Sequence, residues 1–460
     1  MGYNPARLSA RQVAVRKHMR KYKLPLLLGL LLAGIITVWL LPSMLRLLPT
    51  RYAMRLPAPL QALALPADPT PILPTVAAPV AAADLLGNTS ATVTPPASPT
   101  PLAVAEAYST PTLAATLQPT ATATPPPTAT PWPVPAAARM TGFTHVYQEW
   151  NNCGPATLVM ALTYFGRVHS QRDTAAVLRP NPEDRNVTPQ ELAGFVNTQD
   201  GLRGVARING DLDLLKRLLA NEIPVIIEIG FDPPGEYQWL GWYGHYLLPV
   251  AYDDATQQVW VYDSWLGTSE VPQTNADPNG RVLAYADLEA YWAQFNRSYI
   301  VLYEPEQEAL VNELLGATLD DAAMWQASLA RAQADAARDP ANAFYWFNLG
   351  ATYNALGDYE KAATAFDQAL AIGLPWRMLW YQFGPYEAYQ HAGRYDDVVL
   401  LAETTLTDRP FFEESYYYLG LAQSGLGNTE GARANLQKAQ ELNPNFTPAQ
   451  KALAELPPES

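Results

Sequence analysis

The longest uninterrupted apolar run of the chain lies near its N-terminus. Residues 24–45, LPLLLGLLLAGIITVWLLPSML, are 22 positions without a charge, and residues 1–23 hold seven basic side chains and no acidic one. A helix of that length spans about 33 Å, enough to cross a hydrocarbon core of about 30 Å. The nearest alternative is a cleavable signal peptide, whose apolar region is usually about 7–15 residues long. The pattern predicts an uncleaved transmembrane signal-anchor at 24–45 and, by the positive-inside rule, a basic cytoplasmic tail at 1–23.

The next stretch, residues 46–138, shows no periodic spacing of apolar positions. Between residues 56 and 138 there is no lysine or arginine, and proline, threonine and alanine dominate. Proline at this density excludes the interiors of helices and sheets and favours extended polyproline II and coil. We therefore expect a disordered Pro/Thr/Ala-rich stalk that holds the following domain away from the membrane. A spacer with no specific role fits the same composition.

Residues 139–305 combine one apolar helix pattern with several strand patterns. The run PATLVMALTYF at 155–165 is apolar on nearly every face, which indicates a buried core helix. Runs rich in β-branched and aromatic residues lie at 223–230, 245–253, 258–265 and 298–303. One buried helix followed by several strands predicts an α+β domain.

The last segment, residues 306–460, follows a helical period throughout. Turn glycines Gly357, Gly393 and Gly427 are separated by 36 and 34 residues, and aromatic, leucine and small residues recur around them at matching positions. This pattern resembles an all-α tetratricopeptide solenoid of about three repeats, with a degenerate middle copy and a capping helix near 319–340. Such arrays form concave binding surfaces, so the resemblance implies a protein partner, with Tyr353 and Tyr386 expected near that face. A helical appendage that only packs on its neighbour is the alternative.

Composition excludes several classes of function. The 460 residues carry a net charge of -14, but residues 1–55 contain ten basic and no acidic residues, which leaves 20 basic against 44 acidic residues afterwards. A body this acidic repels phosphate backbones, so we expect no nucleic-acid partner. No cluster of histidine and cysteine has the spacing of metal ligands, and we expect no metal ion and no other cofactor.

The single cysteine, Cys153, stands in QEWNNCGPAT at the start of the predicted core helix. A lone cysteine excludes an intramolecular disulfide. A helix N-terminus favours the thiolate, which is the nucleophilic form, and Asn151 or Asn152 is expected to cap the helix. Cys153 is therefore a candidate nucleophile, although a lone cysteine before an apolar helix is more often inert.

A thiolate nucleophile needs a base, and the chain has five histidines. His245 begins a predicted strand, whereas His145 lies in FTHVYQ, which has the pattern of a strand of unknown direction. If the strands at 245–253 and 258–265 form a hairpin, residue 245 faces about residue 264, which brings Asp263 beside His245. An acid there orients the imidazole. Glu228, inside another predicted strand, is expected to face water or the helical C-terminal region.

Taken in order, NNCGPAT, GHY…PV and V…YD resemble the papain-like cysteine peptidases related to the bacteriocin-processing, double-glycine leader peptidases. The resemblance covers about 165 residues. It implies Cys153 as nucleophile, His245 as general base, Asp263 as its orienting carboxylate and Gln148 as an oxyanion donor. Gln148 stands five residues before the cysteine, where the family's glutamine usually stands six before. The leader peptidases face the cytoplasm, so double-glycine leader processing is not carried over to this chain.

Two functions follow from these patterns. The first is a membrane-anchored, extracytoplasmic cysteine peptidase that acts on a peptide or protein through a Cys-His-Asp triad, with the helical repeats binding a protein. The second is a catalytically silent, peptidase-like surface scaffold whose repeats bind a protein partner. The presence of all three catalytic residue types favours the first.

Overall fold

The structure is a computed structural model, and it describes only part of the N-terminal third of the chain. The described residues are 39–41, 43–45, 56–57, 60, 63, 72–76, 82–86 and 134–457, apart from 185, 200, 234–239, 270–272 and 275–276. The predicted cytoplasmic tail and most of the predicted signal-anchor lie outside them. Among the described residues, no helix has the length and apolar character needed to cross a membrane.

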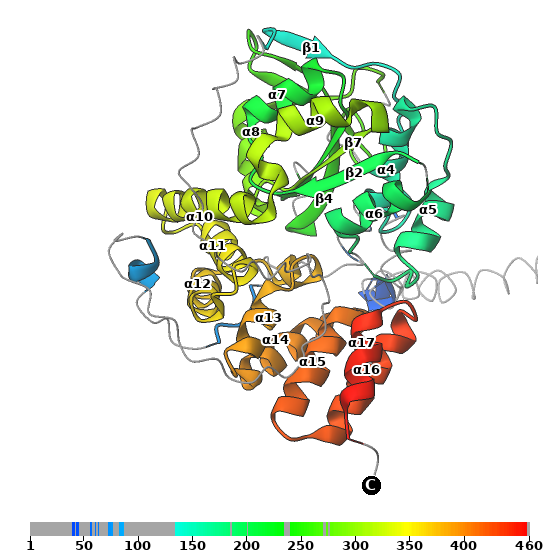
Figure 1. Cartoon of the computed structure of the whole chain (residues 1–460). Helices are drawn as coiled ribbons and strands as arrows, with labels where there is room; N and C mark the ends of the chain where they lie inside the picture. The colour runs from blue at the N-terminus through cyan, green and yellow to red at the C-terminus, as the bar shows by residue number, and fades with distance from the viewer. Residues whose placement is uncertain are drawn as a thin grey trace, which may run out of the picture. The chain divides into compact units, whose positions relative to one another are not determined.

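An antiparallel sheet forms the centre of the region between residues 137 and 303 (Figure 1). The strand order is β2-β7-β3-β4-β5-β6, and β1 pairs with β4. Its strands are β1 (Ala137–Arg139), β2 (Arg203–Arg207), β3 (Val225–Phe231), β4 (Tyr243–Asp253), β5 (Gln258–Asp263), β6 (Arg281–Ala284) and β7 (Tyr299–Tyr303). Each of the four predicted strand runs overlaps an observed strand, whereas β1, β2 and β6 were not predicted.

Helices cover both faces of this sheet (Figure 1). Alternate residues of the central strands point to opposite faces: Ile226 packs with α4 and α6, and Ile227 packs with α7, α8 and α9. The helices of this region are α4 (Cys153–Tyr164), α5 (Gln171–Leu178), α6 (Pro189–Gln199), α7 (Leu212–Ala220), α8 (Tyr285–Trp292) and α9 (Glu308–Leu315). The core helix predicted at 155–165 is α4, and its residues from Gly154 to Leu162 are buried.

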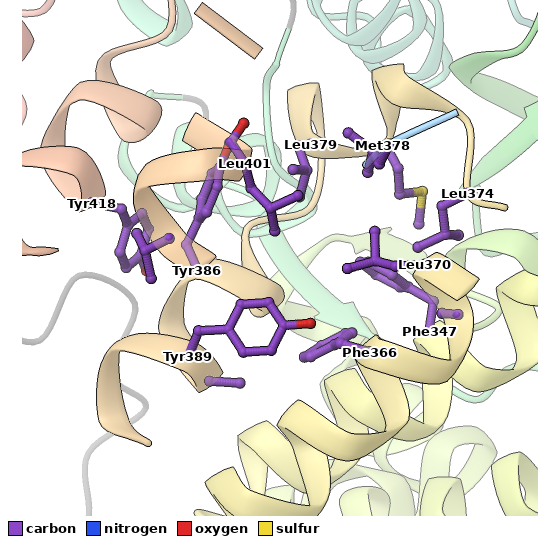
Figure 2. Packing of buried hydrophobic residues seen from close by; sticks show 14 of the residues in the cluster. Phe347, Phe366, Leu370, Leu374, Met378, Leu379, Tyr386, Tyr389, Leu401 and Tyr418 are labelled. Carbon is purple, nitrogen blue, oxygen red and sulfur yellow. The ribbon is translucent and has the colours of Figure 1, made fainter. Parts of the chain in front are cut away.

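The C-terminal region is built from helices that pack as successive antiparallel pairs. They are α10 (Asp321–Arg338), α11 (Ala343–Ala355), α12 (Tyr359–Ile372), α13 (Gly384–His391), α14 (Tyr395–Asp408), α15 (Glu413–Gly425), α16 (Thr429–Leu442) and α17 (Thr447–Glu455). The three turn glycines, Gly357, Gly393 and Gly427, have φ values of 79°, 69° and 80°, a left-handed conformation that glycine adopts without strain. Tyr386 was expected near a binding face, but its side chain is fully buried in the core shown in Figure 2, so that expectation was wrong.

The irregular middle copy is the part of the helical region that packs on strand β4. Its first helix is replaced by the 3-10 helix η6 (Trp376–Trp380) followed by the short α13. Arg377 in η6 donates to the carbonyl oxygen of Trp242 over 2.9 Å and lies 4.0 Å from the ring centroid of Tyr243. The departure from the repeat pattern therefore coincides with a contact to the strand that carries His245.

Parts of the predicted stalk have defined structure. Leu73 is buried, and the 3-10 helix η1 (Ala82–Leu86) packs in the same core as α11 and α12. Ala137 and Ala138 belong to β1, paired with Tyr252 and Asp253 of β4. The expectation of a disordered stalk over all of 46–138 was wrong for these residues, because their apolar side chains find buried positions.

Candidate functional site

Cys153 is the first residue of α4 and is partly buried. Asn152 is the residue before the helix, and its carbonyl oxygen accepts from the backbone N–H of Ala156 over 2.8 Å. Its side chain makes no capping hydrogen bond and instead accepts from Arg179 over 2.6 Å, so the predicted side-chain cap was wrong. The backbone N–H groups of the first helical turn have no partner within the helix, which leaves a positive field around the thiol.

Directly after the cysteine, at Gly154, there is little space for a side chain. A Cβ atom at this position would lie 3.3 Å from the side chain of Val187 and 3.5 Å from the ring of Tyr246 on β4. The start of α4 therefore lies close against β4 beside His245. A larger residue at position 154 would increase the distance between α4 and β4.

His245 lies in β4 and Asp263 ends β5, and the two side chains are in contact. The ring Nε2–H donates to Oδ1 of Asp263 over 3.0 Å. The strands pair as a hairpin with Leu247 opposite Asp263, one residue away from the register obtained by counting from the turn. The turn is centred one residue later than the count assumed, because Asp253 pairs with Gln258, and a bulge between Pro249 and Ala251 removes part of the resulting offset. His245 and Asp263 are consequently diagonal neighbours on one face of the sheet, close enough for long side chains to meet.

The carboxylate of Asp263 is fully buried and held by several donors. Oδ1 accepts from the backbone N–H groups of Trp265 and Leu266, each over 2.9 Å, and Oδ2 accepts from Arg281 over 2.8 Å. Burial alone would raise the pKa of Asp263, but the charges of His245 and Arg281 hold it well below its usual range. The carboxylate is therefore ionised and fixed in orientation at neutral pH.

Arg281 was not identified from the sequence. It begins the short strand β6, and Val261 of β5 lies opposite it. No local pattern marks an arginine that neutralises a carboxylate 18 residues earlier, since the pairing depends on the register between β5 and β6.

The imidazole of His245 is buried between an acid and a thiol. Burial by itself lowers the pKa of His245, but the charge of Asp263, its hydrogen bond, and a hydrogen bond with Cys153 together raise it to about 9. The ring centroid lies 5.7 Å from that of Phe231, which covers it on one side. At neutral pH the ring is therefore an imidazolium.

Gln148 is fixed to the chain that follows Asp263. Its backbone N–H donates to the carbonyl oxygen of Ser264 over 2.8 Å, and its side-chain oxygen accepts from the Ser264 hydroxyl over 2.9 Å. Ser264 therefore contacts the oxygen of the Gln148 side-chain amide and not its NH₂ group. Between Gln148 and Cys153 the chain turns through Asn151, which has a left-handed φ of 57°.

Glu228 lies inside the domain and not at its surface. It is 3% exposed and lies on β3 opposite Tyr246, whose hydroxyl donates to the backbone oxygen of Val187 over 2.7 Å. Its Oε2 has no hydrogen-bond partner among the described residues. Burial raises the pKa of Glu228 well above its usual range, and the negative charge of Cys153 adds to this. The expectation that Glu228 faces water or the helical region was wrong, because β3 lies in the middle of a sheet covered on both faces.

His145 also contacts the acid, through the main chain. Its Nε2–H donates to the backbone oxygen of Asp263 over 2.8 Å, and its ring packs on Tyr147 and Tyr262. The residues around it form no strand, so the strand pattern of FTHVYQ was misleading. Within the described part of the chain, no group of three or more His, Cys, Asp or Glu residues has an arrangement that could hold a metal ion.

Comparison with known families agrees with this architecture. Residues 134–300 match the Peptidase_C39 like family, and residues 343–372 and 413–446 each match a tetratricopeptide repeat family. This chain carries a C39-like peptidase domain followed by two tetratricopeptide repeats. The predicted resemblance to a papain-like cysteine peptidase fused to such repeats is confirmed.

Among solved structures, part of the chain is similar to a crystal structure from Bacillus anthracis that is described as that of a C39-like peptidase. The similarity has 13% sequence identity and a TM-score of 0.29, and it covers 36% of this chain and 98% of the other. No curated protein shows a significant match to the sequence.

Proposed function

We propose that this chain is a cysteine peptidase in which Cys153 is the nucleophile, His245 the general acid and base, and Asp263 the group that orients the imidazole. The observation that carries this proposal is the position of the His245 ring. One nitrogen is held at 3.0 Å by the buried, ionised Asp263, and the side chain of Cys153 contributes to the raised pKa of the ring. The substrate is a peptide or protein, as the C39-like domain suggests.

The reaction begins with attack of the Cys153 thiolate on the carbonyl carbon of the scissile amide. The C=O π electrons move to oxygen, and a tetrahedral intermediate with a C–S bond forms. As it collapses, the C–N bond breaks and His245 gives its proton to the leaving amine. The neutral imidazole then takes a proton from water, the hydroxide displaces the thiolate from the acyl group, and the acid product leaves.

Stabilisation of the oxyanion is assigned to groups at the start of α4. The backbone N–H of Cys153 belongs to the first turn of the helix, and the amide NH₂ of Gln148 is the second donor in this proposal. Ser264 supports this role for Gln148, because its hydroxyl occupies the side-chain oxygen and sets which end of the amide is available. The left-handed turn at Asn151 lies in the segment where the spacing differs from that of the family.

Hydrolysis is expected to fall as the pH rises through about 9. The pKa of His245 is raised to about 9, so the imidazolium that protonates the leaving amine is present below this pH and lost above it. Alkylation of Cys153 by iodoacetamide needs the thiolate but no proton transfer, so its rate should not fall in the same range. The measurement is kcat/KM and the alkylation rate constant between pH 6 and 10; parallel decline of both would contradict the assignment.

The tetratricopeptide repeats are proposed to bind a protein, either the substrate or a partner.

We also propose that residues 24–45 anchor the chain in the membrane, with 1–23 in the cytoplasm and the C39-like domain outside it. The support is the uncharged apolar run and the basic residues that precede it.

The single thiol of the chain makes a direct test possible. At pH 7 we expect the full chain to react with iodoacetamide at least about 10-fold faster than free cysteine, which is only a few per cent thiolate at that pH. Every labelled molecule reports on Cys153, because there is no other cysteine. The second measurement is cleavage of a proteome-derived peptide library read by mass spectrometry, with Cys153→Ala as control.

A catalytically silent scaffold gives the opposite result. In that case the thiol reacts no faster than free cysteine, and the wild-type and Cys153→Ala proteins leave the peptide library equally intact. Either finding would overturn the proposed peptidase.

A further inference from the structure

A short apolar segment from the Pro/Thr-rich region lies on the helical repeats. Ile72 forms an isolated antiparallel β-bridge with Pro375, and the backbone N–H of Leu73 donates to the carbonyl oxygen of Leu374 over 2.9 Å. The Leu73 side chain is 1% exposed within the core of the repeats. Leu374, labelled in Figure 2, lies beside Leu370 and Met378 of the same core. The chain between α12 and η6 thus binds this segment by its main chain.

A second contact follows about ten residues later in η1. Leu85 is buried, and its backbone oxygen accepts from Nε2 of Gln333 over 3.1 Å and from the hydroxyl of Tyr353 over 3.4 Å. Gln333 belongs to α10 and Tyr353 to α11. Ala82 is also buried here, so both ends of the segment insert apolar side chains and satisfy main-chain groups.

These contacts have the features of peptide recognition. Two leucine anchors enter the core of the repeats, while side chains and backbone of the array hydrogen-bond to the main chain of the segment. Ile72 remains 61% exposed, so the segment lies on the surface of the array and is not part of its interior. A segment with few anchors gains limited burial and loses chain entropy when it is ordered, which makes such a contact reversible.

We propose that residues 72–76 and 82–86 act as an internal ligand of the tetratricopeptide repeats, bound on the face formed by α10, α11, α12 and the chain leading into η6. Proteins that bind this face present an apolar peptide with two leucine-type anchors, the first in an extended stretch and the second in a helical turn, and replace the internal segment. The proposal rests on the protein-binding part of the proposed function and requires no catalysis by Cys153. Its tests therefore remain informative if the peptidase assignment fails.

Disulfide trapping tests the contact in the full chain. Residues directly opposed in an antiparallel pair have Cα atoms about 4.5–5.5 Å apart, within the range that a disulfide spans. In a Cys153→Ala background, the pair Ile72→Cys and Pro375→Cys should lose both thiols to maleimide–polyethylene glycol after mild oxidation. The control pair combines Pro375→Cys with Val168→Cys, which is 94% exposed and should remain labelled. Equal labelling of both pairs would overturn the contact.

Peptide binding tests whether the face accepts a ligand in trans. A tethered ligand has an effective concentration of about millimolar, so it outcompetes a free peptide at micromolar concentration. We expect a fluorescent peptide of residues 70–88 to bind the full-chain variant Leu73→Asp, Leu85→Asp at least about 10-fold more tightly than wild type. A peptide with the same two aspartates is the matched control and should bind neither protein.

Each outcome decides the proposal. Tight binding of the peptide to the variant and weak binding to wild type supports an internal ligand. Equal binding to both proteins overturns it because the face would then be unoccupied, and binding to neither overturns it because the face would not accept a peptide. The thermal unfolding curve of the variant, compared with wild type, establishes that the repeats are folded, and the trapping experiment provides an answer without these substitutions.

Discussion

Replacing His245 with alanine is expected to lower kcat/KM by about 10³-fold or more and to slow alkylation of Cys153 at pH 7 by at least about 10-fold. Proton transfer by a positioned side chain contributes about 10²–10⁴ in rate, and in the proposed mechanism the same ring also stabilises the thiolate. The ring is buried and held by Asp263 at 3.0 Å, so no other described imidazole can take its place without rearrangement. Both rate constants are measured on full-length protein.

The matched control is His391→Ala. His391 is exposed on α13 and stacks on Tyr359 with ring centroids 3.9 Å apart, within the repeats. This variant should keep the wild-type alkylation rate and peptide cleavage. If His245→Ala were alkylated as fast as the control, the thiol would not depend on the imidazole, and the catalytic pair would be ruled out.

Arg297→Met is expected to lower the free energy of unfolding by about 3 kcal/mol. Arg297 is 5% exposed, and it donates to Glu289 over 2.6 Å and to Asp335 of α10 over 2.9 Å. Removing one partner of a buried ion pair costs about 3–5 kcal/mol, because the other charge remains without compensation. The exposed Arg338, 2.9 Å from the same carboxylate, reduces that cost. Chemical denaturation followed by tryptophan fluorescence measures the change.

Two further variants separate the causes of this loss. Arg338→Met removes the exposed partner of Asp335 and should cost less than about 1 kcal/mol, as exposed ion pairs do. The double variant Arg297→Met, Asp335→Leu removes both buried charges and should recover most of the stability. If it were as unstable as Arg297→Met, the loss would come from packing and not from an uncompensated charge.

The positions of the main strands and of the core helix follow from local sequence patterns. Runs rich in β-branched and aromatic residues predict β3, β4, β5 and β7, and a continuous apolar run predicts α4. The short strands β1, β2 and β6 have three to five residues and lack such a pattern. They form because longer strands provide hydrogen-bond partners for them, and these partners exist only once the sheet has assembled.

The chemistry of the site was only partly visible from residue types. Cys153, His245 and Asp263 stand out because of their neighbours in the sequence, and counting along the hairpin placed the last two together. The count was one residue off, because the centre of the turn and the bulge that follows it cannot be read from periodicity. Arg281 and the buried Glu228 depend on strand order and on which face of the sheet is covered, so sequence patterns did not identify their environments.

The amino-acid sequence by itself determined the order of the segments, the C39-like and tetratricopeptide character of two of them, and the candidate nucleophile, base and acid. These properties are encoded in residues near one another in the chain. Only the tertiary structure decided the ionised state of Asp263, the imidazolium of His245, the burial of Glu228 and the attachment of Leu73 to the repeats. Each of these depends on groups that are far apart in sequence, since burial and charge act through space and are set only when the elements have packed.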